Sequence, residues 1–467
     1  MKLPKPDILY RGLLLTALLA YGVFCILPHV QFAYFPEWTK YEFFLAGFIV
    51  LCCSSFFYLF WGLSACLYKP FRCLKREELP GVTVIVPAYN EGYHVVRTLE
   101  SLMSADYPLK KLEVIAVNDG SQDNTLCFLR HCAMMYPGRI EVVNLPVNMG
   151  KKHALARGIR KAKHDYIITV DSDTVIEPET LRNLLSPFFH DKRVGAVAGN
   201  IVAGNRKEGF IPKLLDVTLV FGCEFLRTAQ SLTGCVVCTP GALSAYRKEI
   251  LLSHLDEWLD QKFMGCAANI GEDRAIATLI LGAGHRIVHQ RTARCITRMP
   301  VTYNGMCRML IRWNRSDIRE NFLMLRPLFR NKGFLSGRNW LLFFHWIPLM
   351  LNIMLPIFFV PLFLFFLTAT NHLLLFLACN IMATCFFTLI PAVIYGKSRP
   401  GANSSWPYIY GFYYPVALFW IYPWSFFTMR NSRWLTREIT QKNHHPFTRR
   451  FQAACYLNVT RPLRAVS

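Results

Sequence analysis

The chain has 467 residues, of which 53% are hydrophobic, and its formal net charge at pH 7 is +22. This composition is too apolar for an ordinary soluble enzyme, and the charges between the apolar segments exclude a protein made only of membrane-spanning helices. A large positive charge suits nucleic acid or an anionic membrane surface. The long apolar segments favour the membrane, so we expect no nucleic-acid partner. The 16 cysteines are scattered, and we interpret most of them as buried thiols in a reducing compartment.

Two apolar segments near the N-terminus, residues 12–32 and 43–68, are each long enough to cross a bilayer. Lys2 and Lys5 precede the first segment, and four basic residues follow the second within eight positions. Because cytoplasmic flanks are enriched in Lys and Arg, this pattern predicts a transmembrane hairpin over residues 1–80 with both ends in the cytoplasm. The first segment lacks a clear cleavage site, so we do not expect a removed signal peptide.

Residues 81–298 have the composition of a globular α/β domain, which the hairpin places in the cytoplasm. Apolar, β-branched runs alternate with helical stretches, a pattern that predicts a mainly parallel sheet. The expected strands are residues 82–86, 113–117, 140–143 and 166–170, and the expected helices are residues 91–104, 123–136 and 151–163.

Asp171-Ser172-Asp173 follows directly after the strand at residues 166–170. In an open α/β sheet, ligands bind outside the carboxyl ends of the strands, so both carboxylates point toward a ligand crevice. Hard oxygen ligands suit Mg²⁺ or Mn²⁺, which proteins hold with one or two carboxylates plus substrate phosphates. The sequence predicts a metal–diphosphate site, although two such aspartates also serve as a loop start and a helix cap.

Four further polar motifs fall at expected strand ends or helix starts, on the rim where a nucleotide would bind. They are Val86-Pro87-Ala88-Tyr89-Asn90-Glu91, Asn118-Asp119-Gly120-Ser121, Gly150-Lys151-Lys152 and Gly271-Glu272-Asp273-Arg274. Each motif alone has an ordinary explanation, such as a core aromatic, a turn residue, a solvated lysine or acids at a helix start. All of them together, in this order with the two aspartates, favour a nucleotide site.

The segment after the α/β core is helical in pattern and partly basic. Residues 210–232 form either a packed helix or a helix at the membrane surface, and we favour the surface because membrane segments flank the domain. Residues 299–339 interleave arginines with Met, Leu and Phe, which predicts basic interface helices on the anionic cytoplasmic face of a bilayer.

Residues 340–430 are the predicted C-terminal transmembrane region, with apolar runs at 340–368 and 372–395. Lys397 and Arg399 mark the loop that follows as cytoplasmic. The aromatic stretch at residues 406–429 contains three prolines, and a full crossing would place the basic tail outside. We therefore expect a re-entrant or interfacial segment there, with residues 431–467 as a cytoplasmic tail.

With these motifs, the chain resembles the membrane-embedded family 2 glycosyltransferases, above all the hyaluronan synthases and nodulation-type chitooligosaccharide synthases; cellulose and chitin synthases are more distant. The resemblance covers about residues 80–320. Ala229-Gln230-Ser231, the stretch at residues 234–247 and the stretch at residues 430–437 reinforce it. It implies a GT-A type domain with a mainly parallel sheet, inserted between transmembrane helices and accompanied by amphipathic interface helices.

The resemblance implies roles on the donor side of a UDP-sugar site. Tyr89 would stack on the uridine, and Glu91 and Asp119 would hydrogen-bond to it. Lys151 would steady the nucleotide or its phosphates. Asp171 and Asp173 would form the DxD motif, with Asp173 closest to a Mg²⁺ or Mn²⁺ ion.

On the acceptor side, the resemblance makes Asp273, with Glu272 beside it, the catalytic pair; Asp273 would be the general base. Arg312 would pair with the diphosphate, and Trp313 would stack on the acceptor sugar. Cys238 would lie near the acceptor pocket, which explains the Cys235-x-x-Cys238 spacing better than a metal or redox site. The family's Gln-x-x-Arg-Trp motif is altered, because Met309 replaces the glutamine.

We therefore expect an inverting, UDP-sugar-dependent hexosyltransferase of the plasma membrane that polymerises a β-linked glycan and extrudes it through its own helices. The expected donor is UDP-N-acetylglucosamine, with or without UDP-glucuronate. The loss of the glutamine at position 309 keeps a non-processive transferase, acting on a lipid or single acceptor, as the alternative. A transporter or scaffold that only binds nucleotide is the third hypothesis. The motifs leave the sugar, the primer and the oligomeric state open.

Overall fold

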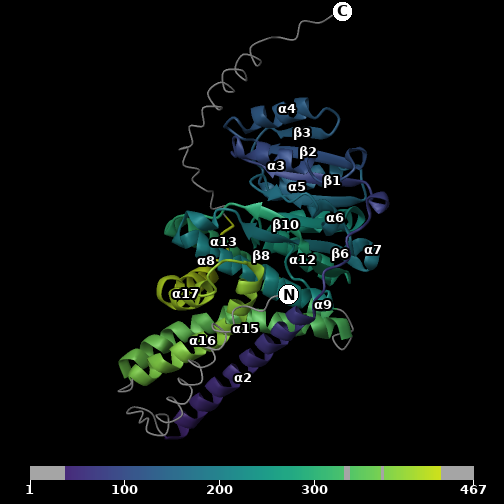
Figure 1. The fold of residues 1–467 in the computed structure, drawn as a ribbon. Coiled ribbons are helices and arrows are strands. Elements are labelled where there is room, and N and C mark those ends of the chain that lie inside the picture. The colour runs from purple at the N-terminus through teal and green to yellow at the C-terminus, as the bar shows by residue number, and fades with distance from the viewer. Residues whose placement is uncertain (1–36, 331–336, 370–372, 433–467) are drawn as a thin grey trace, which may run out of the picture.

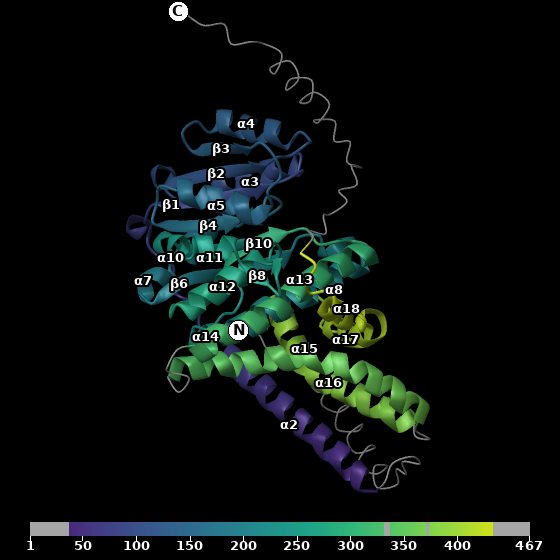
Figure 2. The same ribbon diagram turned by 180° about the vertical axis from the view of Figure 1, so that it is seen from behind.

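The computed structural model describes residues 37–330, 337–369 and 373–432 (Figure 1). The predicted span at residues 12–32 and the basic tail after Ser432, including most of the stretch at 430–437, lie outside the described residues. The sheet and the helices on its two faces form one body, and the long helices α2, α15 and α16 lie together at one end of it (Figures 1 and 2).

The main sheet has eight strands in the order β3-β2-β1-β4-β7-β6-β10-β5. Its pairs β1–β2, β2–β3, β1–β4 and β6–β10 are parallel, whereas β7 is antiparallel to β4 and β6, and β5 is antiparallel to β10. The strands are β1 (Val82–Ala88), β2 (Leu112–Asp119), β3 (Ile140–Leu145), β4 (Tyr166–Val170), β5 (Val175–Ile176), β6 (Val194–Ala203), β7 (Leu243–Arg247) and β10 (Arg286–Thr297). The predicted mainly parallel α/β sheet is confirmed.

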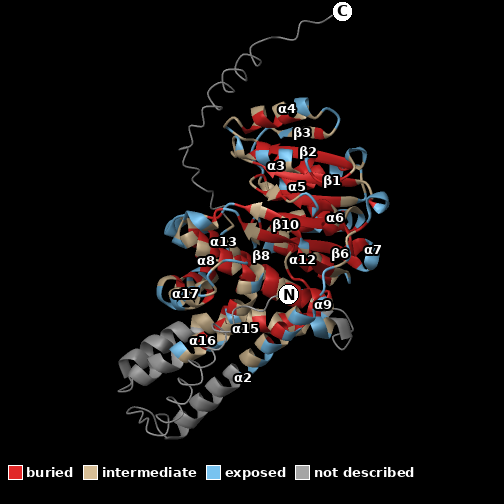
Figure 3. Cartoon of the chain, viewed as in Figure 1, coloured by how far each residue is buried: buried red, intermediate tan, exposed pale blue. Residues whose placement is uncertain are grey.

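Apolar side chains cover both faces of the central strands, as expected for parallel strands with helices on each face. Every residue of β1 and β2 is buried (Figure 3). Val84 packs with α3 and α4 on one face, while Ile85 packs with α5 on the other. The flanking helices are α3 (His94–Met103), α4 (Thr125–Met135), α5 (Lys151–Lys161), α6 (Thr180–Leu185), α7 (Pro187–His190), α10 (Lys248–Ser253), α11 (Leu255–Leu259) and α12 (Glu272–Gly282). The elements predicted up to residue 170 are all present, with small shifts at their ends.

A continuous helical segment lies between the sheet and the apolar helices. It consists of α8 (Phe210–Val220), a π-helical stretch η5 (Phe221–Arg227) and α9 (Thr228–Thr233). It contacts β6 and β10 on one side and α2, α16 and α17 on the other. The segment is therefore packed against protein on both sides, and its predicted position at a membrane surface stays a prediction.

The apolar helices are α2 (Glu37–Leu67), α15 (Gly337–Ala369) and α16 (Leu373–Ser398). Within the described residues, two stretches are long and apolar enough to cross a membrane, Asn339–Ile357 and Ile381–Ser398. The aromatic stretch that follows is broken into α17 (Trp406–Tyr413), π-helical η6 (Tyr414–Leu418) and α18 (Ile421–Phe427). The expectation that residues 406–429 form a re-entrant or interfacial segment stays a prediction.

The arginine-rich region forms α13 (Tyr303–Leu323) and α14 (Leu325–Arg330), and a short hairpin of β8 (Lys262–Phe263) and β9 (Cys266–Ala267) lies beside the main sheet. Arg315 and Arg319 are buried, whereas Arg308 and Arg326 are exposed. Arg315 donates to Thr428 Oγ1, and Arg319 donates to the carbonyl oxygen of Ile270 and to Ser432 Oγ. The prediction that the arginines of this stretch face lipid headgroups is therefore wrong for Arg315 and Arg319, which fix the C-terminal segment to α13.

Candidate active site

The predicted site residues meet at the carboxyl edge of three adjacent strands. Tyr89 follows β1, Asp119 ends β2 and Asp171 follows β4; these strands are neighbours in the order β2-β1-β4. One cavity of about 2560 Å³ opens at this edge. Its lining includes every residue predicted for the site: Tyr89, Glu91, Asp119, Lys151, Asp171, Asp173, Cys238, Glu272, Asp273, Arg312 and Trp313.

Asp119 is held by the backbone of the loop that precedes α5. Its two carboxylate oxygens accept hydrogen bonds from the backbone nitrogens of Met149, at 2.8 Å, and Gly150, at 2.9 Å. Burial raises the pKa of Asp119, and these two hydrogen bonds act in the opposite direction. The loop comes this close because position 120 is glycine: its φ is +67°, and a Cβ there would lie 2.5 Å from the backbone nitrogen of Asn148.

Lys151, the first residue of α5, joins two carboxylates from different elements. Its Nζ lies 2.6 Å from Asp171 Oδ1 and 2.6 Å from Glu272 Oε1. Burial alone would lower the pKa of Lys151, but the two carboxylates raise it far above the ordinary value. Gly241 leaves room for the lysine, because a Cβ at that position would lie 2.5 Å from Nζ. The ammonium group of Lys151 therefore links the end of β4, at Asp171, to the start of α12, at Glu272.

Asp273 lies in the first turn of α12, which begins after Gly271 in the left-handed conformation at φ +75°. Its Oδ1 accepts a hydrogen bond from the backbone nitrogen of Arg274 at 2.8 Å. Burial, and then the neighbouring Glu272 carboxylate, raise the pKa of Asp273 to about 6. Burial would also raise the pKa of Glu272, but Lys151 holds it below its usual value. The two neighbouring acids thus differ: the pKa of Glu272 is lowered, whereas the pKa of Asp273, about 6, would suit a general base near neutral pH.

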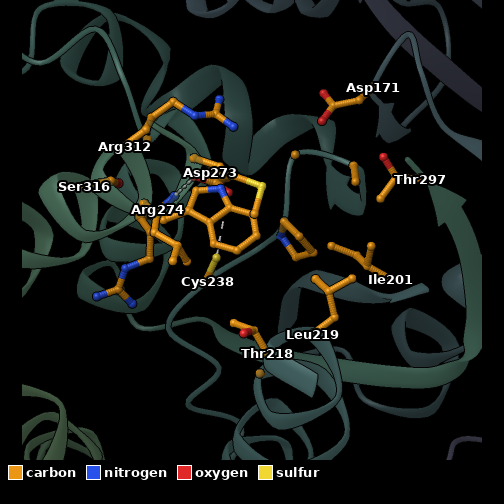
Figure 4. A pocket seen from close by; sticks show the side chains of 18 of the residues that line it. Asp171, Ile201, Thr218, Leu219, Cys238, Asp273, Arg274, Thr297, Arg312 and Ser316 are labelled. Atoms are coloured by element: carbon orange, nitrogen blue, oxygen red, sulfur yellow. Dashed lines mark hydrogen bonds between the residues drawn. The ribbon is translucent and has the colours of Figure 1, made fainter. Parts of the chain in front are cut away.

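Cys238 lies against Asp273. Its Sγ is 3.8 Å from Asp273 Oδ2 (Figure 4). Arg227 of η5 donates a hydrogen bond to Cys238 Sγ at 3.6 Å. Burial raises the pKa of the Cys238 thiol to about 12, so it is neutral at physiological pH. Cys235 and Cys238 are both free thiols.

Arg227 and Asp317 are among the charged residues of the cavity that the sequence did not identify as part of the site. Arg227 contacts both Cys223 and Cys238, and Asp317 of α13 lies 3.1 Å from Arg274. Arg227 stands two positions before Ala229-Gln230-Ser231, and that proximity was the available signal. Asp317 has no local signal, since only the turn of α13 brings it next to α12.

The cavity continues from the sheet edge into the helices. Arg312 and Trp313 of α13 line the cavity, as do Thr218 and Leu219 of α8. Figure 4 shows Arg312, Thr218 and Leu219 around it. Its far part is bounded by residues of the apolar helices and of the broken segment: Leu349, Asn352, Ile353 and Pro356 of α15, Thr384, Phe387, Thr388 and Pro391 of α16, and Tyr410 and Tyr414 near α17.

Asp173 also faces the cavity, and Thr174 Oγ1 donates to its carboxylate at 3.4 Å. Within the described part of the chain, no group of three or more His, Cys, Asp or Glu side chains is placed to hold a metal ion. Asp171 and Asp173 can therefore supply only part of a coordination shell, as is usual where substrate phosphates complete it.

A family comparison assigns the sheet domain. Residues 83–255 match the family described as glycosyl transferase family 2, so the chain carries a domain of that family, with the GT-A type fold. Among curated relatives, a hyaluronan synthase from Streptococcus pyogenes is 35% identical over 280 residues, covering 58% of this chain and 64% of the relative. An N-acetylglucosaminyltransferase from Mesorhizobium japonicum is 35% identical over 253 residues, covering 54% of this chain and 59% of the relative.

The chain thus matches less than two thirds of the length of these relatives. Among solved structures, a mannosyltransferase from Pyrobaculum calidifontis, determined with GDP-Man and Mn²⁺, aligns with a TM-score of 0.47 and 25% identity, over 64% of this chain and 84% of that one.

Proposed function

We propose that this protein is a membrane-embedded, inverting glycosyltransferase that polymerises a β-linked, hyaluronan- or chitin-like glycan from UDP-sugars and passes it across the plasma membrane. The curated relatives, a hyaluronan synthase and an N-acetylglucosaminyltransferase, support glycan synthesis. UDP-N-acetylglucosamine, with or without UDP-glucuronate, is the proposed donor.

The observation that carries the proposal is the continuity of the cavity. The same space is lined by Asp119 at the sheet edge, by Asp273 and Trp313 in the middle, and by Thr384 and Tyr410 among the apolar helices. A transferase that released a short product to the cytoplasm would not need a passage between apolar helices. A growing glycan needs one, and its hydroxyl groups suit the threonine and tyrosine hydroxyls of this far part.

In the proposed mechanism, Tyr89 and Asp119 bind the nucleoside at the rim, and Arg312 and Lys151 stabilise the negative charge of the leaving diphosphate. Asp273 accepts the proton of the acceptor hydroxyl as the hydroxyl oxygen attacks the anomeric carbon and the bond to the diphosphate breaks. A raised pKa suits this role, because the carboxylate is charged at neutral pH yet basic enough to take the proton. One displacement of this kind inverts the anomeric configuration.

A divalent ion fits the residues present. Asp173, with Asp171 beside it, offers hard oxygen ligands in the cavity, and the remaining positions suit diphosphate oxygens. When bound, a Mg²⁺ or Mn²⁺ ion would offset charge on the leaving diphosphate. Lys151 engages Asp171 Oδ1, which leaves Asp173 as the principal proposed ligand.

The proposed arrangement places the sheet domain, residues 81–298, in the cytoplasm, and the apolar helices of residues 1–80 and 340–430 in the bilayer. The two long apolar stretches in α15 and α16 support a membrane location. The region at residues 299–339 would lie at the interface between the two, with Arg308 and Arg326 as its exposed cations toward the lipid surface.

A non-processive transferase is the second candidate, favoured by Met309. This side chain is buried and lines the cavity three residues before Arg312, where it cannot supply the hydrogen bonds of a glutamine amide. A glycan held with fewer hydrogen bonds leaves more readily, which would shorten the product.

The test is incubation of the purified protein in lipid nanodiscs with a panel of radiolabelled UDP-sugars, each with Mn²⁺ or with a chelator. UDP release and product length on gels are measured together. We expect UDP release with UDP-N-acetylglucosamine, a chelator-sensitive rate, and long chains. UDP release with only mono- or disaccharide products would favour the second candidate, and no UDP release with any donor would contradict the proposal.

A further inference from the structure

Asp216 and Arg399 form a buried ion pair far from each other in sequence. The guanidinium of Arg399 donates from Nε to both carboxylate oxygens of Asp216, at 3.1 and 3.2 Å, and from Nη2 to Oδ1 at 2.9 Å. Tyr395 donates its hydroxyl to Oδ2 at 3.1 Å, and Arg206 Nη1 lies 3.7 Å from the same oxygen. Asp216 is fully buried and Arg399 is 5% exposed.

The pair joins two neighbouring helices that both line the far part of the cavity. Asp216 lies on α8, whose next three residues, Val217–Leu219, line the cavity. Arg399 directly follows α16, which contacts α8 and lines the cavity at Thr384 and Thr388. Asp216 itself does not line the cavity, so the pair contacts the outside of the wall and not the contents.

A buried ion pair of this kind adds little to the stability of the folded protein, but it restricts the relative positions of the two helices that it joins. Removing two charges from water is costly, and apolar residues of similar size often stabilise as well or better. A planar guanidinium bound to both oxygens of a carboxylate tolerates little rotation or sliding. Val217, Val220 and Tyr395 form a buried apolar cluster beside the pair, which excludes water and strengthens the attraction.

We propose that the Asp216–Arg399 pair is a positioning latch that holds α8 and α16 in register, so that the growing glycan stays bound between successive transfers. The inference rests on the proposed polymer synthesis and adds to it a determinant of chain length. The length of the product depends on the rate of sugar transfer relative to the rate at which the glycan dissociates from the enzyme. The latch acts on release, because the donor residues at the sheet edge are positioned by strands and loops that neither partner of the pair contacts.

Lys397 provides a matched control. It carries the same charge two residues before Arg399, but its side chain is exposed. If positive charge at the end of α16 only orients the helix in the membrane, loss of either residue should have the same effect. If the buried contact matters, only the loss of Arg399 should change the product.

The experiment compares the wild type with D216N, R399Q, R399K and K397Q, each as the full chain in nanodiscs, by UDP release and by product length from the same reaction. We expect D216N and R399Q to lose the longest chains while UDP release continues at the wild-type rate. K397Q should match the wild type. R399K keeps the charge and the fold but lacks the planar fork, so it should give intermediate lengths.

The double reversal D216R/R399D should recover part of the length lost in D216R alone. The proposal is overturned if R399Q and K397Q give the same length, or if UDP release and length fall together, as in a merely destabilised protein. If D216N and R399Q do not fold, R399K decides: wild-type length in R399K overturns the latch. A wild-type protein that makes no polymer would contradict the proposed function instead.

Discussion

The two ends of the cavity are built in different ways. At the sheet edge, each functional side chain lies within a few residues of a strand end or a helix start, such as Asp119 at the end of β2, where the loop at Met149–Gly150 holds it. At the helical end, side chains within or after helices contact elements more than 100 residues away, such as Arg315 with Thr428 and Asp216 with Arg399. We propose that the chemistry depends on the first kind of construction, and that the shape of the far part of the cavity depends on the second.

The substitution Asp273→Asn tests most directly the chemistry proposed for the sheet edge. The amide keeps the shape of the side chain and the hydrogen bond from the Arg274 backbone nitrogen, but it cannot take the proton from the attacking hydroxyl group. We therefore expect the rate of sugar transfer, measured by UDP release, to fall by about 10²–10⁴-fold. Stability should not fall, because a neutral amide replaces a buried carboxylate. The midpoint of thermal unfolding in detergent is the control, and transfer that stays near the wild-type rate would contradict the assignment of the base.

Gly120→Ala tests whether the backbone approach beside Asp119 is needed. Gly120 has φ +67° and packs against the Val147–Asn148 backbone, whereas Gly138 has φ +71° and nothing within 4 Å of its missing Cβ. Alanine in the left-handed region costs about 1–2 kcal/mol at either site, and only position 120 adds a backbone clash. We therefore expect G120A, but not G138A, to weaken UDP binding measured by calorimetry. Equal UDP affinity in the two variants would show that the close approach is unimportant.

Arg319→Gln and Arg308→Gln probe the helical end. The buried Arg319 donates to Ile270 and Ser432, so its loss should lower the free energy of unfolding by about 1–3 kcal/mol. The exposed Arg308 should matter by no more than about 0.5 kcal/mol. Thermal unfolding of the two variants in the same detergent gives the difference. If R308Q were the more destabilised, the burial pattern of α13 would be wrong.

The pH dependence of transfer gives a smaller and graded effect. Asp273 has a pKa of about 6, and only its deprotonated form accepts a proton. The rate should be flat above this pH and fall about tenfold for each unit below it. In D273N the residual rate should lose this step. An inflection at the usual aspartate pKa near 4 would mean that burial does not shift this carboxyl in the working enzyme.

The sequence predicted the sheet edge well and the helical end poorly, for a physical reason. Asp171, Lys151 and Asp273 could be found because a strand end or a helix start fixes where such a residue points. The positions of Arg315 and Arg399 could not, because an arginine beside apolar residues has the same local pattern whether it faces lipid headgroups or a buried partner. Arg399 fits the enrichment of basic residues in cytoplasmic loops, yet its side chain forms an ion pair with Asp216, a residue 183 positions earlier.

The π-helical stretch Phe221–Arg227 also affects how the gene for this protein can change. Successive residues of an α-helix are rotated by about 100°, so deleting one residue within α8 would turn every later side chain of that helix away from its present direction. A π-helical turn is wider than an α-helical turn, so a deletion within Phe221–Arg227 can convert the stretch to α-helix and leave α8 and α9 in their present orientations. Single-codon deletions should therefore be tolerated more often in this stretch than in α8.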